Sequence, residues 1–413
     1  MGSNTALSPS LQSPMTDTSP STAPLLIIGA GLAGWTTARE FRKLDTTTPV
    51  VLATADSGDF YAKPTLSNAY AQKRTPAQLV STPAAKMAET LNVTLLAHHR
   101  VQSLDTAARS VVVSHEGQSQ TLHYSRLVLA TGAQPIRIPM GGNAASQVKS
   151  INTLDDFAVF HQALGLDPGA TGVASGKTVV IMGAGLIGCE FANDLLLAGA
   201  TVHVVDPSPR PLALLLPAEA GEQLQAALLA RGVVWHLGTT VTHLDQQQGG
   251  LQVQLADGST VGADMVLSAV GLRADTTLAA AAGLACERGI VVNDLLQTSA
   301  AGIYALGDCA QYASAGQRTL PYVMPIMNAA RALAATLAGT ATPLVFPLMP
   351  VSIKTPALPT VVAAPHPDQP GTWKAGDGEG FWQFVDADGV QRGFVLTGAS
   401  TARRMEQSKA TQA

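Results

Sequence analysis

Paired cysteines are missing from this sequence of 413 residues. The three cysteines, Cys189, Cys286 and Cys309, are widely separated along the chain. This spacing argues against a disulfide scaffold, a zinc finger and an iron–sulfur cluster. The histidines are scattered as well, with His98 and His99 as the one adjacent pair. We therefore expect no metal site.

Charged residues are also scarce: they make up 13% of the chain, against roughly a quarter in average proteins. The 25 basic residues are outnumbered by 29 acidic ones, which argues against nucleic-acid binding. No signal peptide and no charge-free apolar stretch of about 20 residues is present, so we expect no membrane insertion and a cytoplasmic location. The hydrophobic share of 46% is instead typical of large buried sheets.

Two glycine motifs dominate what is present. Gly29-Ala30-Gly31-Leu32-Ala33-Gly34 follows the apolar run Leu25–Ile28, and Gly183-Ala184-Gly185-Leu186-Ile187-Gly188 follows Thr178–Met182. In a strand–turn–helix unit the first glycine makes the turn, the second lets a pyrophosphate approach the backbone, and the third lets helix and strand pack closely. One such motif is weak evidence. Two in matching contexts predict two dinucleotides in one protein.

The pattern after each motif is the same: a crossover helix, a strand, hairpin material and a small-residue turn. We therefore expect an α/β protein with two Rossmann-like dinucleotide-binding domains, each with a three-layer ββα arrangement. Residues 24–145 and 272–340 are expected to form the first domain and 146–271 the second. A small mixed α/β or β-rich domain is expected at 341–405, a tail at 406–413, and disorder at 1–23, where Ser, Thr and Pro are frequent.

Four segments resemble the FAD-dependent pyridine nucleotide reductases, flavoproteins with two dinucleotide-binding domains. They are the two glycine motifs, Ala130-Thr131-Gly132-Ala133, and Ile303-Tyr304-Ala305-Leu306-Gly307-Asp308. The resemblance implies permanent FAD binding at the first motif and transient NADH binding at the second. Asp308 is implied to contact the flavin ribityl chain.

The rubredoxin–NAD reductases are the branch of this family that the chain resembles more narrowly. The segments Tyr322-Val323-Met324-Pro325 and Met349–Pro356 carry that likeness most specifically. The resemblance implies an oxidoreductase that transfers a hydride from NADH to FAD and then single electrons to rubredoxin. A monomer is implied, and either alkane degradation or oxygen-stress detoxification as the downstream system.

The motifs and the resemblance together give the expected binding residues. For FAD these are Gly29, Gly31, Leu32, Ala33, Gly34, Asp56, Lys63, Pro64, Val101, Ala130, Thr131, Gly132, Asp308, Val323, Pro325 and Lys354. For NADH they are Gly183, Gly185, Leu186, Ile187, Gly188, Glu190, Asp206, Val270 and Gly271.

Lys63 and Glu190 are the candidate catalytic pair. A lysine near flavin N5 would favour the reduced flavin, and Glu190 would orient both Lys63 and the nicotinamide. The alternatives are a solvated loop lysine and a glutamate that stabilises the first turn of its helix. A helix is expected at Pro325–Ala338, with Pro325 at its first position. Its N-terminus would stabilise negative charge on the reduced flavin, or the helix would be a core helix with Pro325 as its start signal. Tyr61–Val80 is expected to be irregular and polar.

The ends of the second strands of the two domains differ. Asp206 ends this strand in the second domain, where it would accept both ribose hydroxyls and favour NADH over NADPH. Arg210 is a nearby group that can accept a 2′-phosphate. In the first domain Thr54 stands at the matching place and Asp56 follows two residues later. The ribose of FAD is therefore expected to bind Asp56, or backbone and hydroxyl groups.

Other functions also suit a two-dinucleotide chain. They are a [2Fe-2S] ferredoxin reductase, and an NADH-sensing flavoprotein that does not turn over. A disulfide reductase or NADH oxidase is disfavoured because no cysteine lies between Gly34 and Gly183. Rubredoxins are typically acidic, so we expect a local basic docking patch, with Lys73-Arg74, Arg318 and Arg403-Arg404 as candidates.

Overall fold

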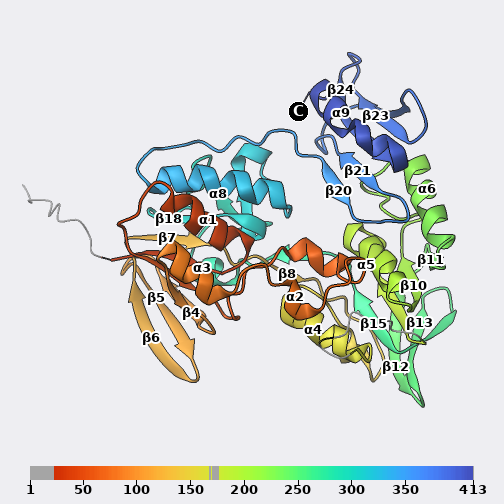
Figure 1. The fold of residues 1–413 in the computed structure, drawn as a ribbon, viewed down its shortest axis with the longest axis horizontal. Coiled ribbons are helices and arrows are strands. Elements are labelled where there is room, and N and C mark those ends of the chain that lie inside the picture. Colours follow the sequence, from red (N-terminus) through yellow and green to blue (C-terminus); the bar gives the residue numbers. More distant parts are fainter. Residues whose placement is uncertain (1–22, 167–168, 170–175, 413) are drawn as a thin grey trace, which may run out of the picture.

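The computed structural model describes residues 23–166, 169 and 176–412, which form three domains (Figure 1). Of residues 1–23, for which disorder is expected, 1–22 lie outside the described residues. No described helix combines the length and the apolar character that a membrane crossing requires.

The first domain has a parallel five-stranded sheet between helices and a small antiparallel sheet. Its strand order is β18-β7-β1-β2-β3, and the second sheet has the order β4-β5-β6. The parallel strands are β1 (Leu25–Ile28), β2 (Val50–Ala53), β3 (Thr94–Leu96), β7 (Arg126–Leu129) and β18 (Ile303–Ala305). The antiparallel strands are β4 (Arg100–Asp105), β5 (Ser110–His115) and β6 (Gln118–His123). Helices α1 (Leu32–Arg42), α3 (Ala84–Leu91), α7 (Thr277–Ala281) and α8 (Val323–Leu337) pack in this domain.

The second domain repeats this arrangement. Its parallel sheet has the order β11-β10-β9-β15, and its antiparallel sheet the order β12-β13-β14. The strands are β9 (Thr178–Met182), β10 (Thr201–Asp206), β11 (Val234–Leu237), β12 (Val241–Gln247), β13 (Gly250–Leu255), β14 (Thr260–Ala263) and β15 (Met265–Ser268). The helices are α4 (Leu154–Ala163), α5 (Leu186–Leu197) and α6 (Ala218–Leu229). The duplication read from the sequence is thus present in the fold.

The chain crosses between these domains on paired strands. β8 (Ala133–Pro135) and β16 (Leu272–Ala274) run antiparallel and hydrogen-bond to each other. The second domain begins earlier than residue 146, because Gly141 pairs with β12 and Ala144 lies in the core of that domain. Residues 141–145 join it because their backbone groups find partners there.

Residues 61–80 belong to the first domain in sequence but pack on the second. They form a 3-10 helix, η1 (Lys63–Asn68), and the short helix α2 (Pro76–Leu79). Leu66, Tyr70 and Leu79 are buried in one cluster with Phe157 of α4 and Phe191 of α5. The expectation of an irregular polar segment was therefore wrong: its spaced apolar side chains reach across to the neighbouring domain.

The C-terminal domain is an antiparallel sheet with the order β20-β21-β24-β23-β22, reached through a long connection from α8 (Figure 1). Its strands are β20 (Val351–Ile353), β21 (Thr360–Ala363), β22 (Thr372–Ala375), β23 (Phe381–Val385) and β24 (Gln391–Thr397). Residues 406–410 of the tail expected at 406–413 instead belong to helix α9 (Arg404–Ala410), where buried Gln407 accepts a hydrogen bond from Gln391 of the sheet.

Candidate active site

The two glycine turns have the same geometry. Gly29 and Gly183 have φ values of +107° and +104°, a region that favours glycine. A Cβ at Gly34 would lie 1.9 Å from the Gly29 carbonyl oxygen, and the same distance separates a Cβ at Gly188 from the Gly183 oxygen. The third glycine of each turn therefore allows helix and strand to touch.

The middle glycines face open space. A Cβ at Gly31 or Gly185 would meet no atom within 4 Å. Both turns open onto one continuous cavity of about 2930 Å³, which runs between the three domains. Its lining includes both Asp56 of the first domain and Asp206 of the second. Its volume and its two backbone cradles suit two dinucleotides.

Most of the sequence-predicted residues line this cavity. On the first-domain side they are Gly29, Gly31, Leu32, Ala33, Asp56, Lys63, Pro64, Val101, Ala130, Thr131, Gly132, Asp308, Val323 and Pro325, and the C-terminal domain adds Lys354. On the other side they are Gly183, Gly185, Leu186, Ile187, Glu190, Asp206, Val270 and Gly271. Gly34 and Gly188 do not line it, because they serve the packing described above.

Lys63 lies in a polar cluster that lines the cavity. Its ammonium donates a hydrogen bond to Asn152 Oδ1, and Asn152 Nδ2 donates to the Ala133 carbonyl oxygen at 2.9 Å. Burial lowers the pKa of Lys63, and the nearby carboxylates of Asp308 and Asp156 oppose this. Burial raises the pKa of Asp308, and Lys63 opposes that. These two groups form one electrostatic unit.

Glu190 contacts different partners from those expected. It is fully buried and accepts hydrogen bonds from Lys354 Nζ at 2.6 Å, Lys354 N at 2.9 Å and Ser67 Oγ at 2.5 Å. The expected contact with Lys63 is absent from the described residues, because Lys63 is engaged by Asn152. Glu190 thus joins β20 and η1, the C-terminal and first domains.

The strand ends differ as the sequence indicates. Asp206 lines the cavity and accepts hydrogen bonds from Ala184 N and Ser208 N, both at 2.7 Å. Asp56 accepts one from Thr54 Oγ1 at 2.6 Å and one from Gly58 N at 3.0 Å. In both cases a carboxylate braces the turn that would hold a ribose.

Arg210 does not face the cavity. Its side chain lies against Gly221 of α6, where a Cβ would come within 3.0 Å of Arg210 Cδ. The buried Nε of Arg210 has no hydrogen-bond partner among the described residues. The structure therefore removes the nearby cation that would receive a 2′-phosphate.

The helix after Tyr322 begins two residues earlier than expected. α8 starts at Val323, so Pro325 is its third residue rather than its first. A proline there is tolerated because the first-turn N–H groups have no partner within the helix. The N-terminal end of α8 still lines the cavity, and Tyr322, Val323 and Met324 are exposed on its rim.

Comparison with known proteins agrees with this architecture. Residues 23–334 match the pyridine nucleotide-disulphide oxidoreductase family, and residues 343–411 match a rubredoxin-binding C-terminal domain. The chain belongs to this oxidoreductase family. The fold, predicted as two dinucleotide-binding domains and a C-terminal domain, is confirmed.

Two curated relatives are similar over almost the whole chain. The rubredoxin-NAD(+) reductase of Acinetobacter baylyi is 42% identical over 92% of this chain and 95% of its own. The protein of the same name from Alcanivorax borkumensis is 43% identical over 94% and 98%. Among solved structures, the ferredoxin reductase for the CYP199A2 system from Rhodopseudomonas palustris is 26% identical, with a TM-score of 0.81 over 94% of this chain and 95% of that one.

The disulphide chemistry in the family name has no counterpart among the described residues. Cys189, Cys286 and Cys309 are free thiols, and the first and last are buried. Burial raises the pKa of all three thiols, so they stay protonated. The described residues also contain no group of three or more potential metal ligands.

Three polar residues of the site were not predicted from the sequence. Asn152 binds Lys63, Ser67 binds Glu190, and Asp194 binds the backbone that follows η1. The spacing of Glu190 and Asp194, one helical turn apart, is the signal that was present. Asn152 lies outside the helices and strands and Ser67 lies in the short 3-10 helix η1, so no helical or strand periodicity in the sequence indicates their contacts.

Proposed function

We propose that this protein is an NADH:rubredoxin oxidoreductase that uses FAD. The observation that carries the proposal is one cavity that joins two equivalent glycine turns and ends against the C-terminal domain. The residues present suit a dinucleotide at each turn, since the open backbone at Gly31 and Gly185 leaves room for a pyrophosphate. Bound FAD would supply the chemistry that accepts a hydride and releases electrons singly.

The chain's own residues would then orient the reactants. Lys63, held by Asn152, places a positive charge beside Asp308 in the cavity lining. Glu190 and Lys354 place the C-terminal domain against α5 and close the cavity from one side. We infer that Asp308 and Lys63 bind the flavin side, and that Asp206 binds the adenosine ribose of NADH.

Preference for NADH follows from the second strand end. The Asp206 carboxylate would repel a 2′-phosphate, and Arg210 lies against α6 instead of facing the cavity. We therefore infer that NADPH is the poorer donor.

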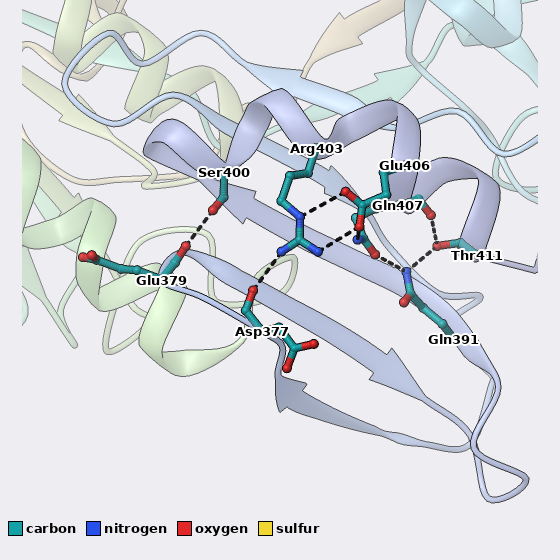
Figure 2. A network of polar contacts seen from close by, with 8 residues as sticks. All are labelled: Asp377, Glu379, Gln391, Ser400, Arg403, Glu406, Gln407 and Thr411. Carbon is teal, nitrogen blue, oxygen red and sulfur yellow. Dashed lines mark hydrogen bonds and ion pairs between the residues drawn. The ribbon is translucent and has the colours of Figure 1, made fainter.

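The docking site for rubredoxin is inferred on the rim between α8 and α9. Arg318 and Arg404 line the cavity, as do the exposed residues Tyr322 and Met324. Arg403 is unsuitable because its guanidinium already binds both Glu406 carboxylate oxygens and the Asp377 carbonyl oxygen, as Figure 2 shows. Lys73 and Arg74 lie outside the cavity lining. An acidic partner would meet apolar contacts flanked by two arginines.

Stopped-flow kinetics tests the function. The holoenzyme is reduced with NADH or NADPH and then mixed with rubredoxin, a [2Fe-2S] ferredoxin or oxygen. We expect fast reduction by NADH and fast reoxidation by rubredoxin. Fast reoxidation by ferredoxin alone would favour the ferredoxin reductase alternative, and reoxidation by oxygen alone would overturn both.

Adjacent arginines provide a matched test of the docking surface. Arg404→Ala is expected to raise the KM for rubredoxin at low ionic strength about tenfold, an effect that salt removes. Arg403→Ala is the control, since that charge is neutralised by Glu406. Equal KM values for the two variants would contradict this surface.

The cellular setting is part of the proposal. We infer a cytoplasmic monomer that supplies electrons to rubredoxin for alkane degradation or for removal of reactive oxygen species. Sedimentation of the holoenzyme tests the monomer, and reconstitution with a rubredoxin-dependent hydroxylase tests the first of these two roles.

A further inference from the structure

One face of α5 carries two buried carboxylates. Glu190 and Asp194 are one helical turn apart and are 0% and 1% exposed. Glu190 lines the cavity, whereas Asp194 does not. The role of Asp194 must therefore lie in its contacts with protein rather than with a cofactor.

Asp194 binds the backbone of the other dinucleotide domain. Its Oδ1 accepts a hydrogen bond from Ala71 N at 2.7 Å, and its Oδ2 accepts one from Tyr70 N at 3.1 Å. Both N–H groups lie just after η1, the 3-10 helix that begins at Lys63. Buried backbone donors need partners, so this carboxylate fixes the place where the segment meets α5.

Glu190 holds the same segment from one turn earlier. Its Oε2 accepts the hydrogen bond from Ser67 Oγ, three residues before Tyr70. The two carboxylates thus hold residues 67–71 by hydrogen bonds at two points, a contact called the grip below. Because α5 begins at the second glycine turn, this grip links the NADH side of the cavity directly to the segment that carries Lys63.

We propose that Asp194 is a positioning residue for hydride transfer, which anchors residues 67–71 to α5 and so holds Lys63 and Ser67 in place at the cavity. This inference rests on the proposed function. Asp194 itself touches neither cofactor nor reacting atoms. Its loss should therefore slow the chemical step while leaving the affinity for NADH almost unchanged.

The charged groups around Asp194 give a second, independent readout. Glu190 on α5 faces it, Tyr70 lies in the gripped segment, and His161 on α4 is 3.2 Å from the Tyr70 hydroxyl through its Nδ1. Asp194 forms no ion pair in the described part of the chain. Burial raises the pKa of Asp194 to about 6, with a further contribution from Glu190, against the opposing effect of the backbone N–H groups.

The sign of the pH effect follows from this shift. The closed segment binds a proton more tightly than an opened one, whose carboxyl has a pKa of about 4. Closing is therefore favoured at low pH, and opening becomes easier as the pH rises through 6. Between pH 5 and 7 the opening equilibrium should increase about tenfold, and it should level off above that range.

The Asp194→Asn holoenzyme tests the positioning role. Its amide is neutral and keeps the shape, but its NH2 group cannot accept a hydrogen bond, whereas both oxygens of a carboxyl group can even when it is protonated. One of the two backbone N–H groups therefore loses its partner. We expect the single-turnover rate of flavin reduction by NADH to fall about tenfold, with the KM for NADH within about twofold of the native value. An unchanged rate, or a fall caused wholly by KM, would overturn the proposal.

Amide hydrogen exchange of Tyr70 and Ala71 is the second test, and it needs no electron acceptor. After correction for intrinsic exchange, the native protein should show the tenfold loss of protection between pH 5 and 7. If the protection of these amides in the native protein did not change with pH, the proposal would be overturned even if the variant failed to fold. In Asp194→Asn the protection should not depend on pH.

Asn193→Ala is the matched control. Asn193 is also buried on α5, but it accepts a hydrogen bond from Ala357 N of the C-terminal domain. The pH dependence of Tyr70 and Ala71 exchange should persist in this variant. A native protein that NADH cannot reduce would disprove the proposed function, whereas the exchange data would still decide whether Asp194 holds the segment.

Discussion

The two glycine turns restrict side chains in the same way, but their surroundings differ. At both turns a Cβ added to the third glycine would lie 1.9 Å from the carbonyl oxygen of the first glycine. Around the first turn, however, the cavity wall holds the Lys63–Asp308 unit. Around the second, the buried carboxylate of Glu190 is paired with Lys354, and the cavity edge carries Leu214, a leucine that is 103% exposed.

This difference distinguishes a site that holds its cofactor permanently from a site that exchanges it. Partly buried charge that forms no direct ion pair among the described residues, as at Lys63 and Asp308, is organised around a resident group, because such charge is costly when nothing contacts it. An exposed leucine on the edge gains contact only when a ligand arrives. We read the first turn as the permanent FAD site and the second as the NADH site, and the variants below test that reading.

Paired substitutions at the third glycines should give the largest effect. In both Gly34→Ala and Gly188→Ala a methyl group meets a backbone oxygen, so the local strain is matched. Overpacking of this kind costs about 1–3 kcal/mol. We expect Gly34→Ala to lose bound flavin, and Gly188→Ala to keep flavin but lose at least about tenfold in kcat/KM for NADH. Flavin-to-protein ratios and NADH titrations measure both, and the opposite pattern would reverse the assignment of the two sites.

The strand-end carboxylates come next. Hydrogen bonds to a charged group contribute about 1.5–3 kcal/mol, so Asp206→Ala should raise the KM for NADH about tenfold to a hundredfold. Part of that loss would come from Ala184 N and Ser208 N, which the carboxylate braces. Asp206→Asn separates the two effects, because an amide oxygen still accepts one of these bonds.

Asp56→Asn is the partner variant in the first domain. It should weaken FAD binding, measured by fluorescence on release of flavin, without changing the KM for NADH. A change in the NADH constant alone would show that the strand ends do not divide between the cofactors as proposed.

Sequence reasoning reached the parts of the molecule that local rules govern. The glycine turns, the parallel strands that enter them and the acidic end of β10 each depend on residues close together in the chain. Most of the predicted residues also line one cavity, because strand ends in parallel sheets gather at one edge.

Contacts between distant segments could not be read in the same way. Glu190 binds Lys354, which lies in another domain, and nothing in the spacing of either residue selects that partner over Lys63. The burial of residues 61–80 also depends on a surface that the neighbouring domain supplies. Helix α9 was missed because it has seven residues, most of them polar, which give a weak helical signal in the sequence. The sheet against which they pack supplies the missing stabilisation.

Asp308→Asn tests the cost of buried charge in the first domain. Burial raises the pKa of Asp308, so the folded apoprotein binds a proton more tightly than the unfolded chain. Native stability is therefore lost as the pH rises from the ordinary carboxyl range through the raised value. The Asn variant lacks this loss, and its apoprotein should be more stable than the native one at pH 7.5 but not at pH 4. Urea unfolding of flavin-free protein at both values measures the difference, and equal differences at the two pH values would contradict it.

Leu214 should give the smallest effect and the clearest contrast with the first domain. Its side chain is free in solvent at the Asp206 end of the cavity, where the adenine of NADH would lie under the proposed assignment. Covering part of a leucine contributes about 1 kcal/mol, so Leu214→Ser should raise the KM for NADH about fivefold and leave kcat unchanged.

Leu229→Ser is the matched control for Leu214, because this leucine at the end of α6 is 58% exposed but lies outside the cavity lining. Inhibition by ADP-ribose should weaken in parallel with NADH binding in Leu214→Ser, since the leucine would contact only the adenosine half. Reduced nicotinamide mononucleotide, which lacks that half, should react equally well with the native protein and the variant. If the mononucleotide lost as much as NADH, Leu214 would act on the nicotinamide end, and the contrast between a closed flavin wall and an open adenine edge would fail.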